Sequence, residues 1–363
     1  MKKLLVCGLG SGYGGVSNVI MNVLRDIPQG TWDITVVETY DSVYHDEILE
    51  LGNKIIKFPP FKKYFRYKKA VKKFLKDNPF DAVWINNTAK VDLVIMKFAK
   101  KQGAKIITHS HGSIQEGSKL KRVVFEIINK LNEKKFYSYL DYGIACSQSS
   151  ADYFYNKRYL KDKNLCILTN AISCEKYAFS EELRDIARSE FGVGQDDIVL
   201  ACIGRICAVK NLGFAIEVIE KLPENYKLVI IGGGDAESLK LQISERRLEE
   251  KVLLLGERSD INVLLNGIDI LLLPSISEGL PMIVLEAQAN GIKCIISDKV
   301  STECKALDNA EFVPIEDAQN WAEVILNADH HRVQDSVTIM QNKGFDIKDY
   351  SRKLLEIVDS CVK

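Results

Sequence analysis

The sequence has no long apolar segment, no clustered cysteines and no excess of charge of either sign. No run reaches the roughly 18 apolar residues of a membrane-spanning helix, and the apolar stretch 4–7 meets glycine too early for the core of a signal peptide. The nine cysteines include no Cys-x-x-Cys pair, and His330-His331 lack the spacing of metal ligands. We therefore expect reduced thiols, no structural metal and a cytoplasmic protein.

The length and the pattern of apolar runs predict two α/β domains. The 363 residues, 46% of them hydrophobic, correspond to about two globular domains. Short β-rich runs alternate with helical patterns, which is typical of parallel sheets covered by helices on both faces. The predicted strands are 3–7, 34–38, 82–85, 105–108, 142–145 and 165–168, then 199–203, 227–231, 252–255, 270–273, 293–296 and 311–313. We expect tandem doubly wound domains over 1–175 and 176–345, facing each other across a cleft, and a last helix over 346–363.

The zero net charge conceals two halves of opposite sign. Residues 1–180 contain 29 Lys and Arg against 17 Asp and Glu, whereas the remainder contain 20 against 32. Within the basic half, Lys54–Lys76 has ten basic residues, no acidic residue and six aromatic residues. Such a segment suits peripheral contact with an anionic membrane, and a solvated helix with inward aromatic residues fits it equally well. Nucleic acid is not expected, because no binding motif accompanies the charge.

A glycine-rich turn follows the first predicted strand. Its glycines allow close approach of the backbone to a phosphate, and the N-terminus of the next helix attracts anions. Gly10-x-Gly12-x-x-Gly15, with Glu38 ending the second strand, also matches the dinucleotide fingerprint. This motif keeps open a nicotinamide-dependent oxidoreductase, and equally a tight turn without a ligand.

Two cations follow the first strand of the second half, in the sequence Gly204-Arg205 and at Lys210. The guanidinium of Arg205 can make paired contacts with phosphate, and the ammonium of Lys210 supplies a compact charge. Together they could neutralise a diphosphate without a metal, although solvated surface charge is the simpler alternative. The absence of any Asp-x-Asp sequence fits a metal-independent site.

Two carboxylates, Glu278 and Glu286, lie within the segment Pro274–Ala287. If Gly279-Leu280-Pro281 forms the turn into a helix, Glu286 lies one to two turns inside that helix. The apolar residues around Glu286 make a solvated surface position a poor explanation. Carboxylates directed at a ligand accept paired hydrogen bonds from neighbouring hydroxyl groups, so both residues are candidates for binding such a ligand.

These motifs, in this order, resemble the retaining glycosyltransferases of family 4, most closely members that assemble exopolysaccharides and capsules. The resemblance covers nearly the whole chain. It rests on Gly14-Gly15-Val16, His109-Ser110-His111-Gly112, Thr169–Ile172, Gly204-Arg205 with Lys210, Ile231–Gly234, and Glu278 with Glu286. The family has two Rossmann-like domains in the GT-B arrangement, an N-terminal acceptor domain, a C-terminal donor domain, and a last helix that crosses back to the first domain.

The resemblance implies a role for each motif residue. Arg205 and Lys210 would bind the donor diphosphate and stabilise the leaving group, and Glu286 would hold the ribose hydroxyls. Glu278 would lie beside the transferred sugar. The remaining donor-binding positions would be Gly279, Leu280 and Pro281 in the second domain and Gly14 and Gly15 in the first. His111, or otherwise His109, would face the transferring sugar.

The expected activity is transfer of a hexosyl or N-acetylhexosaminyl group from a nucleoside-diphosphate sugar to a saccharide or lipid-linked acceptor. The family resemblance implies retention of anomeric configuration and a place in the assembly of bacterial surface polysaccharide. No cofactor or metal is expected beyond the donor, and the protein would act in the cytoplasm, at the inner face of the membrane if Lys54–Lys76 binds lipid. A non-catalytic partner subunit with the same fold is the second alternative.

Overall fold

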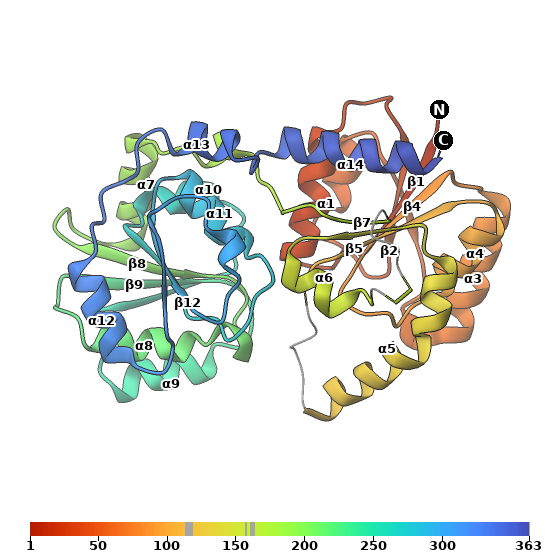
Figure 1. Ribbon diagram of the computed structural model, residues 1–363. Coiled ribbons are helices and arrows are strands. Elements are labelled where there is room, and N and C mark those ends of the chain that lie inside the picture. The colour runs from red at the N-terminus through yellow and green to blue at the C-terminus, as the bar shows by residue number, and fades with distance from the viewer. Residues whose placement is uncertain (113–118, 157, 160–163, 363) are drawn as a thin grey trace. The chain divides into compact units, whose positions relative to one another are not determined.

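The computed structural model describes residues 1–112, 119–156, 158–159 and 164–362. The chain forms two compact units, one of Met1–Asn170 with Ile347–Lys363 and one of Ala171–Asp346. The chain first passes from one unit to the other between residues 170 and 171, and not at the predicted boundary 175/176. Within the second unit, Ile172 already donates its N–H to Phe345 O at 3.0 Å. The predicted pair of doubly wound domains is confirmed (Figure 1).

The first unit is built on a fully parallel sheet of seven strands in the order β3-β2-β1-β4-β5-β6-β7. The strands are β1 (Lys3–Cys7), β2 (Asp33–Glu38), β3 (Lys54–Lys57), β4 (Ala82–Asn87), β5 (Lys105–Ser110), β6 (Tyr142–Ala145) and β7 (Leu165–Ile167). The order reverses between β1 and β4, so the loops that follow these two strands diverge at the carboxyl edge. Ligands of such folds bind at this point.

Helices cover both faces of this sheet. They are α1 (Gly15–Asp26), α2 (His45–Glu50), η1 (Phe61–Lys63), α3 (Tyr64–Asp77), α4 (Val94–Lys101), α5 (Lys119–Tyr139), α6 (Gln148–Phe154) and α14 (Ile347–Val362). The last helix packs against α1, β4 and β5 and buries Tyr350, Leu354 and Val358, whose spacing of four places them on one helical face (Figure 1). The C-terminus therefore belongs to the first unit.

The segment Lys54–Lys76 forms β3, η1 and most of α3. Two of its aromatic residues, Phe58 and Tyr67, are buried in the core. Tyr64 and Phe65 stay exposed, with 41% and 85% of their surface accessible. Some of these aromatic side chains therefore turn inward as one alternative predicted, and contact with a membrane stays a prediction. None of the described helices is long and apolar enough to span a bilayer.

The second unit repeats the plan with six parallel strands in the order β10-β9-β8-β11-β12-β13. These are β8 (Ile198–Ile203), β9 (Tyr226–Ile231), β10 (Val252–Gly256), β11 (Ile270–Leu273), β12 (Lys293–Ser297) and β13 (Ala310–Val313). The helical segments are η3 (Cys174–Tyr177), α7 (Glu181–Phe191), η4 (Ala208–Lys210), α8 (Leu212–Glu220), α9 (Glu237–Glu245), α10 (Ile261–Leu264), η5 (Leu265–Gly267), α11 (Met282–Ala289), η6 (Thr302–Cys304), α12 (Ala318–Asn327) and α13 (Ser336–Asn342). Here the order reverses between β8 and β11.

Candidate functional site

The loops that follow β8 and β11 meet at this reversal of strand order. Ile276 donates its N–H to Val209 O at 2.8 Å, which joins the two loops. Across this junction, Lys210 Nζ lies 2.6 Å from Glu278 Oε1. Ser275 Oγ donates to the same oxygen at 3.1 Å. Two residues that the sequence analysis singled out separately are therefore one ion pair at the ligand-binding edge.

Glycines bring the loops after β8 and β9 into backbone contact. A Cβ on Gly232 would lie 1.9 Å from Gly204 O, so no other residue fits there without moving one loop. Gly204 itself has φ +142°, and a Cβ on it would lie 3.0 Å from Lys210 Cε. This packing presents Arg205 on an exposed turn and sets the Lys210 side chain against the end of β8.

The pairing of Lys210 with Glu278 was not foreseen. Their side chains are 18% and 20% exposed, so the pair is partly shielded from water. An ammonium has three hydrogen-bond donors, and contact with Glu278 leaves capacity for a phosphate oxygen. Glu278 thus orients the Lys210 ammonium as well as offering an acceptor beside it.

Glu286 is buried on α11, with 6% of its surface exposed. The hydroxyl of Tyr177, in η3, donates to Glu286 Oε1 at 3.1 Å. Burial raises the pKa of Glu286 to about 7, against the lowering effects of the Tyr177 hydrogen bond and the Lys176 charge. A carboxyl group in this state exchanges its proton near neutral pH and accepts hydrogen bonds best when ionised.

The other predicted residues of this edge form the turn into α11. Gly279 is partly buried, and Leu280 and Pro281 are buried. Pro281 occupies the N-cap position of α11 with extended backbone, φ −71° and ψ 116°. The start of the helix therefore follows directly on the loop that holds Glu278.

In the first unit, Gly14 and Gly15 begin α1. Gly14 is the N-cap, with no side chain to bond the free N–H groups of the first turn. No atom lies within 4 Å of a Cβ built on either glycine, so the space beside the turn is open. Open space and free amides are what an anion needs at a helix start, and the role of these two glycines stays a prediction.

The two histidines of the His109–Gly112 motif differ in their surroundings. His109 is buried, with its ring centroid 6.2 Å from that of Trp84 and 6.4 Å from that of Tyr350. His111 is only partly buried, and its Nε2 lies 2.8 Å from Asn86 Oδ1. Desolvation lowers the pKa of His111 to about 3, so its ring is neutral at physiological pH. His109 has the surroundings of a core residue, which leaves His111 as the better candidate to contact a ligand.

Glu38 does not have the surroundings that a dinucleotide fingerprint requires. It is 1% exposed, and its Oε2 lies 3.0 Å from His45 Nδ1. The fingerprint needs this carboxylate at the ligand edge to bind a ribose hydroxyl. The geometry therefore gives no support to the oxidoreductase alternative.

Three positioning residues escaped the sequence analysis: Asn86, Tyr177 and Ser275. Asn86 lies in β4, which extends two residues beyond the predicted strand. Tyr177 and Ser275 lie in irregular segments, where no periodicity marks a functional position. Among the residues that the structure describes, no group of three or more His, Cys, Asp or Glu side chains is arranged to hold a metal ion.

Comparison with known proteins identifies the family of the chain. A family model described as Glycosyltransferase Family 4 matches residues 13–176, and one described as Glycosyl transferases group 1 matches residues 184–341. EpsF of Bacillus subtilis (strain 168) is 24% identical over 349 residues, which cover 90% of this chain and 88% of EpsF. An Escherichia coli enzyme named UDP-Gal:alpha-D-GlcNAc-diphosphoundecaprenol alpha-1,3-galactosyltransferase is 27% identical over 240 residues, 64% of this chain and 61% of its own.

A solved structure shares the fold over the whole chain. The crystal structure of Anabaena HepE in complex with UDP and glucose has a TM-score of 0.81 and 18% identity, and the match covers 99% of this chain and 100% of HepE. The two family models together span most of the sequence, in the order that the motifs predict. The chain belongs to the family 4 glycosyltransferases and has their GT-B fold.

Proposed function

We propose that this enzyme transfers a sugar from a UDP-sugar to a saccharide or lipid-linked acceptor during assembly of a surface polysaccharide. The observation that carries the proposal is the Lys210–Glu278 pair beside Arg205 at the reversal of strand order in the second unit. The choice of uridine is supported by the UDP in the HepE crystal and by the UDP-Gal in the name of the Escherichia coli relative. That name also includes a diphosphoundecaprenol acceptor, which supports a lipid-linked acceptor here.

The proposed chemistry follows from the charges at this edge. As the anomeric bond breaks, negative charge develops on the leaving diphosphate, and Arg205 with Lys210 stabilises it electrostatically. Glu286 accepts hydrogen bonds from the ribose hydroxyls and so fixes the nucleoside. Glu278 holds Lys210 in place and accepts a hydrogen bond from a hydroxyl of the transferred sugar. In the first unit, Gly14 and Gly15 offer backbone amides to the phosphates, and His111 contacts the sugar.

Metal independence and retention of configuration are part of the proposal. Two cations can neutralise a diphosphate without a divalent ion, and the sequence contains no Asp-x-Asp. Turnover that survives excess chelator supports metal independence, and a strict requirement for added Mg²⁺ or Mn²⁺ contradicts it. NMR of the first product formed reports its anomeric configuration and so tests whether the configuration is retained.

A thermal-shift panel tests the donor assignment. UDP, GDP, ADP, CMP and NAD(H) are compared with and without chelator, since a ligand at 100 times its Kd stabilises by about 2.7 kcal/mol. A shift with UDP in the presence of chelator supports the proposal. A shift with NAD(H) alone contradicts it, and UDP binding without turnover of any UDP-sugar favours the partner-subunit alternative.

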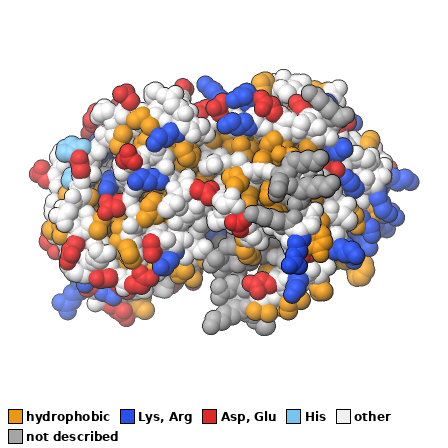
Figure 2. All heavy atoms as spheres, in the orientation of Figure 1, with side chains coloured by type: hydrophobic (Ala, Val, Ile, Leu, Met, Phe, Trp, Pro, Cys, Tyr) orange, Lys and Arg blue, Asp and Glu red, His pale blue; other side chains and the backbone are white. Residues whose placement is uncertain are grey.

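We also propose that the first unit contacts an anionic membrane. Its support is the basic α3, with exposed Tyr64 and Phe65, and a second exposed face on α5. On α5 the exposed aliphatic residues are Val123, Val124, Ile127 and Leu131. Figure 2 shows Lys and Arg side chains gathered along the margin of this unit.

A further inference from the structure

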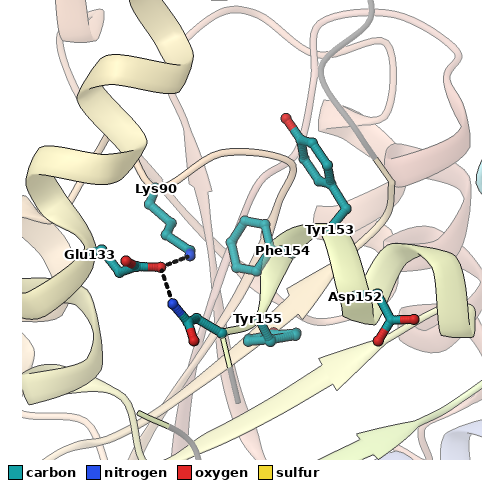
Figure 3. Close-up of a pocket in the computed structure, with 7 residues that line it drawn as sticks. Lys90, Glu133, Asp152, Tyr153, Phe154 and Tyr155 are labelled. Atoms are coloured by element: carbon teal, nitrogen blue, oxygen red, sulfur yellow. Dashed lines mark hydrogen bonds and ion pairs between the residues drawn. The ribbon is translucent and has the colours of Figure 1, made fainter. Parts of the chain in front are cut away.

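A hollow of about 470 Å³ lies in the first unit, and none of the residues that line it is assigned above to the donor. Its walls are Lys90 from the loop after β4, Glu133 from α5, and the stretch Asp152–Asn156 at the end of α6 (Figure 3). The volume falls within the roughly 300–1,000 Å³ of small-molecule sites. It is large enough for one sugar ring.

Lys90 is a buried cation whose hydrogen-bonding capacity is only partly used. Its side chain is 9% exposed, and the rings of Phe136, Tyr137 and Phe154 lie 5.1 to 5.4 Å from its Nζ. In the described part of the chain, its ammonium has one acceptor, Glu133 Oε1, at a long 3.5 Å. An ammonium has three donors, so two remain for water or a ligand in the hollow.

The acceptors of the hollow lie beside this cation. Glu133 Oε1 also accepts from Asn156 Nδ2 at 3.3 Å, and Figure 3 shows the carboxylate and the Lys90 ammonium directed toward each other next to Phe154. A carboxylate can accept about four hydrogen bonds, so Glu133 retains capacity for hydroxyl donors. Asp152 adds a second carboxylate to the lining.

The balance of charge selects the class of ligand. The Lys90 ammonium and the Glu133 carboxylate form a pair without net charge, and Asp152 adds a negative charge to the lining, so a phosphate or other anion would meet no net positive charge. A purely apolar ligand would cover the Lys90–Glu133 pair without using the hydrogen-bonding capacity that the pair leaves open. A neutral polyhydroxyl ring uses both groups, because its hydroxyls donate to the carboxylate and accept from the ammonium while the 43% exposed Tyr153 offers an apolar ring face.

The hollow is connected through β4 with His111, the residue proposed to contact the transferred sugar. Lys90 belongs to the loop that leaves β4, and Asn86, at the end of the same strand, holds His111. We propose that this hollow binds one neutral sugar residue of the acceptor glycan. The assignment to the acceptor rests on the proposed function, whereas the binding of a neutral sugar does not.

Saturation-transfer NMR tests the site directly. The probes are the methyl glycosides of glucose, galactose, N-acetylglucosamine and N-acetylgalactosamine, added to the protein with and without saturating UDP. We expect at least one glycoside to bind and to remain bound when UDP is present. Absence of signal from all four, or displacement by UDP, overturns the proposal.

Surface variants localise the bound glycoside. Tyr153→Ala and Asp152→Asn change exposed side chains of α6 and should weaken binding about tenfold or more, the loss of one good contact. Tyr40→Ala, at a tyrosine that is 53% exposed elsewhere in the unit, is the matched control. Equal binding by Tyr153→Ala and the control overturns the site.

The thermal shift with UDP keeps the two proposals separate. The Tyr153 and Asp152 variants should retain the full UDP shift, because the hollow contains no donor-binding residue. A protein that binds a glycoside in the hollow but never binds UDP would contradict the proposed function alone. Once an acceptor is known, Tyr153→Ala should raise its KM and leave the KM of the donor unchanged.

Discussion

At the scale of single residues, Glu286 combines two requirements that oppose each other. Its position within α11, where all the helical residues are buried, desolvates the carboxylate and raises its pKa. The proposed recognition of ribose hydroxyls needs the ionised form, which is the better acceptor. The hydroxyl of Tyr177 offsets part of the desolvation, since it donates to the carboxylate in the absence of a ligand.

We predict that Glu286→Gln changes the pH dependence of stability. The unfolded chain releases this proton near 4.5 and the folded chain near 7, so the wild-type protein loses stability as pH rises between those values. The loss is about 3 kcal/mol at most, because one pKa unit corresponds to 1.36 kcal/mol. Glutamine is neutral throughout, so the variant should melt higher than wild type at pH 8 and nearly equally at pH 4.

Thermal melts of the two proteins at both pH values check this prediction. Glu249→Gln, which changes an exposed glutamate of the same unit, serves as the control and should follow wild type. If Glu286→Gln melts below wild type at pH 8, the carboxylate is stabilising when ionised and the raised pKa is wrong.

The second prediction for a single residue concerns Lys210. Lys210→Met should lower the transfer rate by roughly 10²- to 10³-fold, the usual cost of losing one preorganised charge at a transition state. Because Glu278 holds Lys210 at 2.6 Å, the effects of Lys210→Met and Glu278→Gln should not add in the double variant. Steady-state rates with a UDP-sugar donor provide the measurement.

The matched control is Lys240→Met, which removes a lysine that is 61% exposed on α9. Its rate should equal that of wild type. A Lys210→Met rate within about threefold of the control would remove Lys210 from the catalytic machinery.

At the scale of elements, the central strands of the second unit follow from the sequence because they are buried on both faces. Ile270–Leu273 is an unbroken apolar run, and it forms β11 without a shift of boundary. Lys54–Lys57 was missed as β3, since lysines at both ends of an edge strand hide its two isoleucines in a basic segment. Local pattern therefore failed at this edge strand, although it identified the other edge strands, β7, β10 and β13.

The contacts of the site could be predicted only in part. The sequence indicated Lys210, Glu278 and Glu286 through motif order, but their partners depend on tertiary structure. Lys210 meets Glu278 because the strand order reverses between β8 and β11, a property of the sheet that no spacing encodes. Tyr177 reaches Glu286 from η3, a short irregular turn with no periodic signal.

The close packing of the loops after β8 and β9 predicts a sharp effect of Gly232→Ala. The added methyl group would overlap Gly204 O, so one loop must move, at a cost of about 1–3 kcal/mol for overpacking. The same movement displaces Arg205, and UDP affinity should fall together with the melting temperature. Thermal melts with and without UDP measure both effects.

Gly194→Ala is the control, since a Cβ there makes only an ordinary contact, 3.5 Å from Asp197 Oδ2. This variant should bind UDP as wild type does. Wild-type UDP affinity in Gly232→Ala would mean that the loop after β8 does not position the donor.

At the scale of the whole molecule, the two halves of the sequence have opposite net charges. The first 180 residues have an excess of 12 basic residues and the rest an equal excess of acidic ones. Attraction to an anionic lipid surface then acts on the first unit and repulsion on the second, so the charge distribution favours one orientation at a membrane. In the proposed membrane contact, exposed apolar side chains on α3 and α5, among them Phe65 and Leu131, would insert into the lipid and add to this attraction.

We therefore predict flotation with vesicles of mixed phosphatidylglycerol and phosphatidylcholine at moderate salt, and none with phosphatidylcholine alone. Raising the salt should release the protein, because the attraction between its basic residues and the lipid is screened. The double variant Phe65→Ser and Leu131→Ser should bind the anionic vesicles more weakly than wild type, whereas Leu241→Ser, at a leucine that is 59% exposed on α9 of the second unit, should bind equally. Equal flotation of the double variant and wild type would show that α3 and α5 do not enter the bilayer, and no flotation of wild type would contradict membrane contact by the first unit.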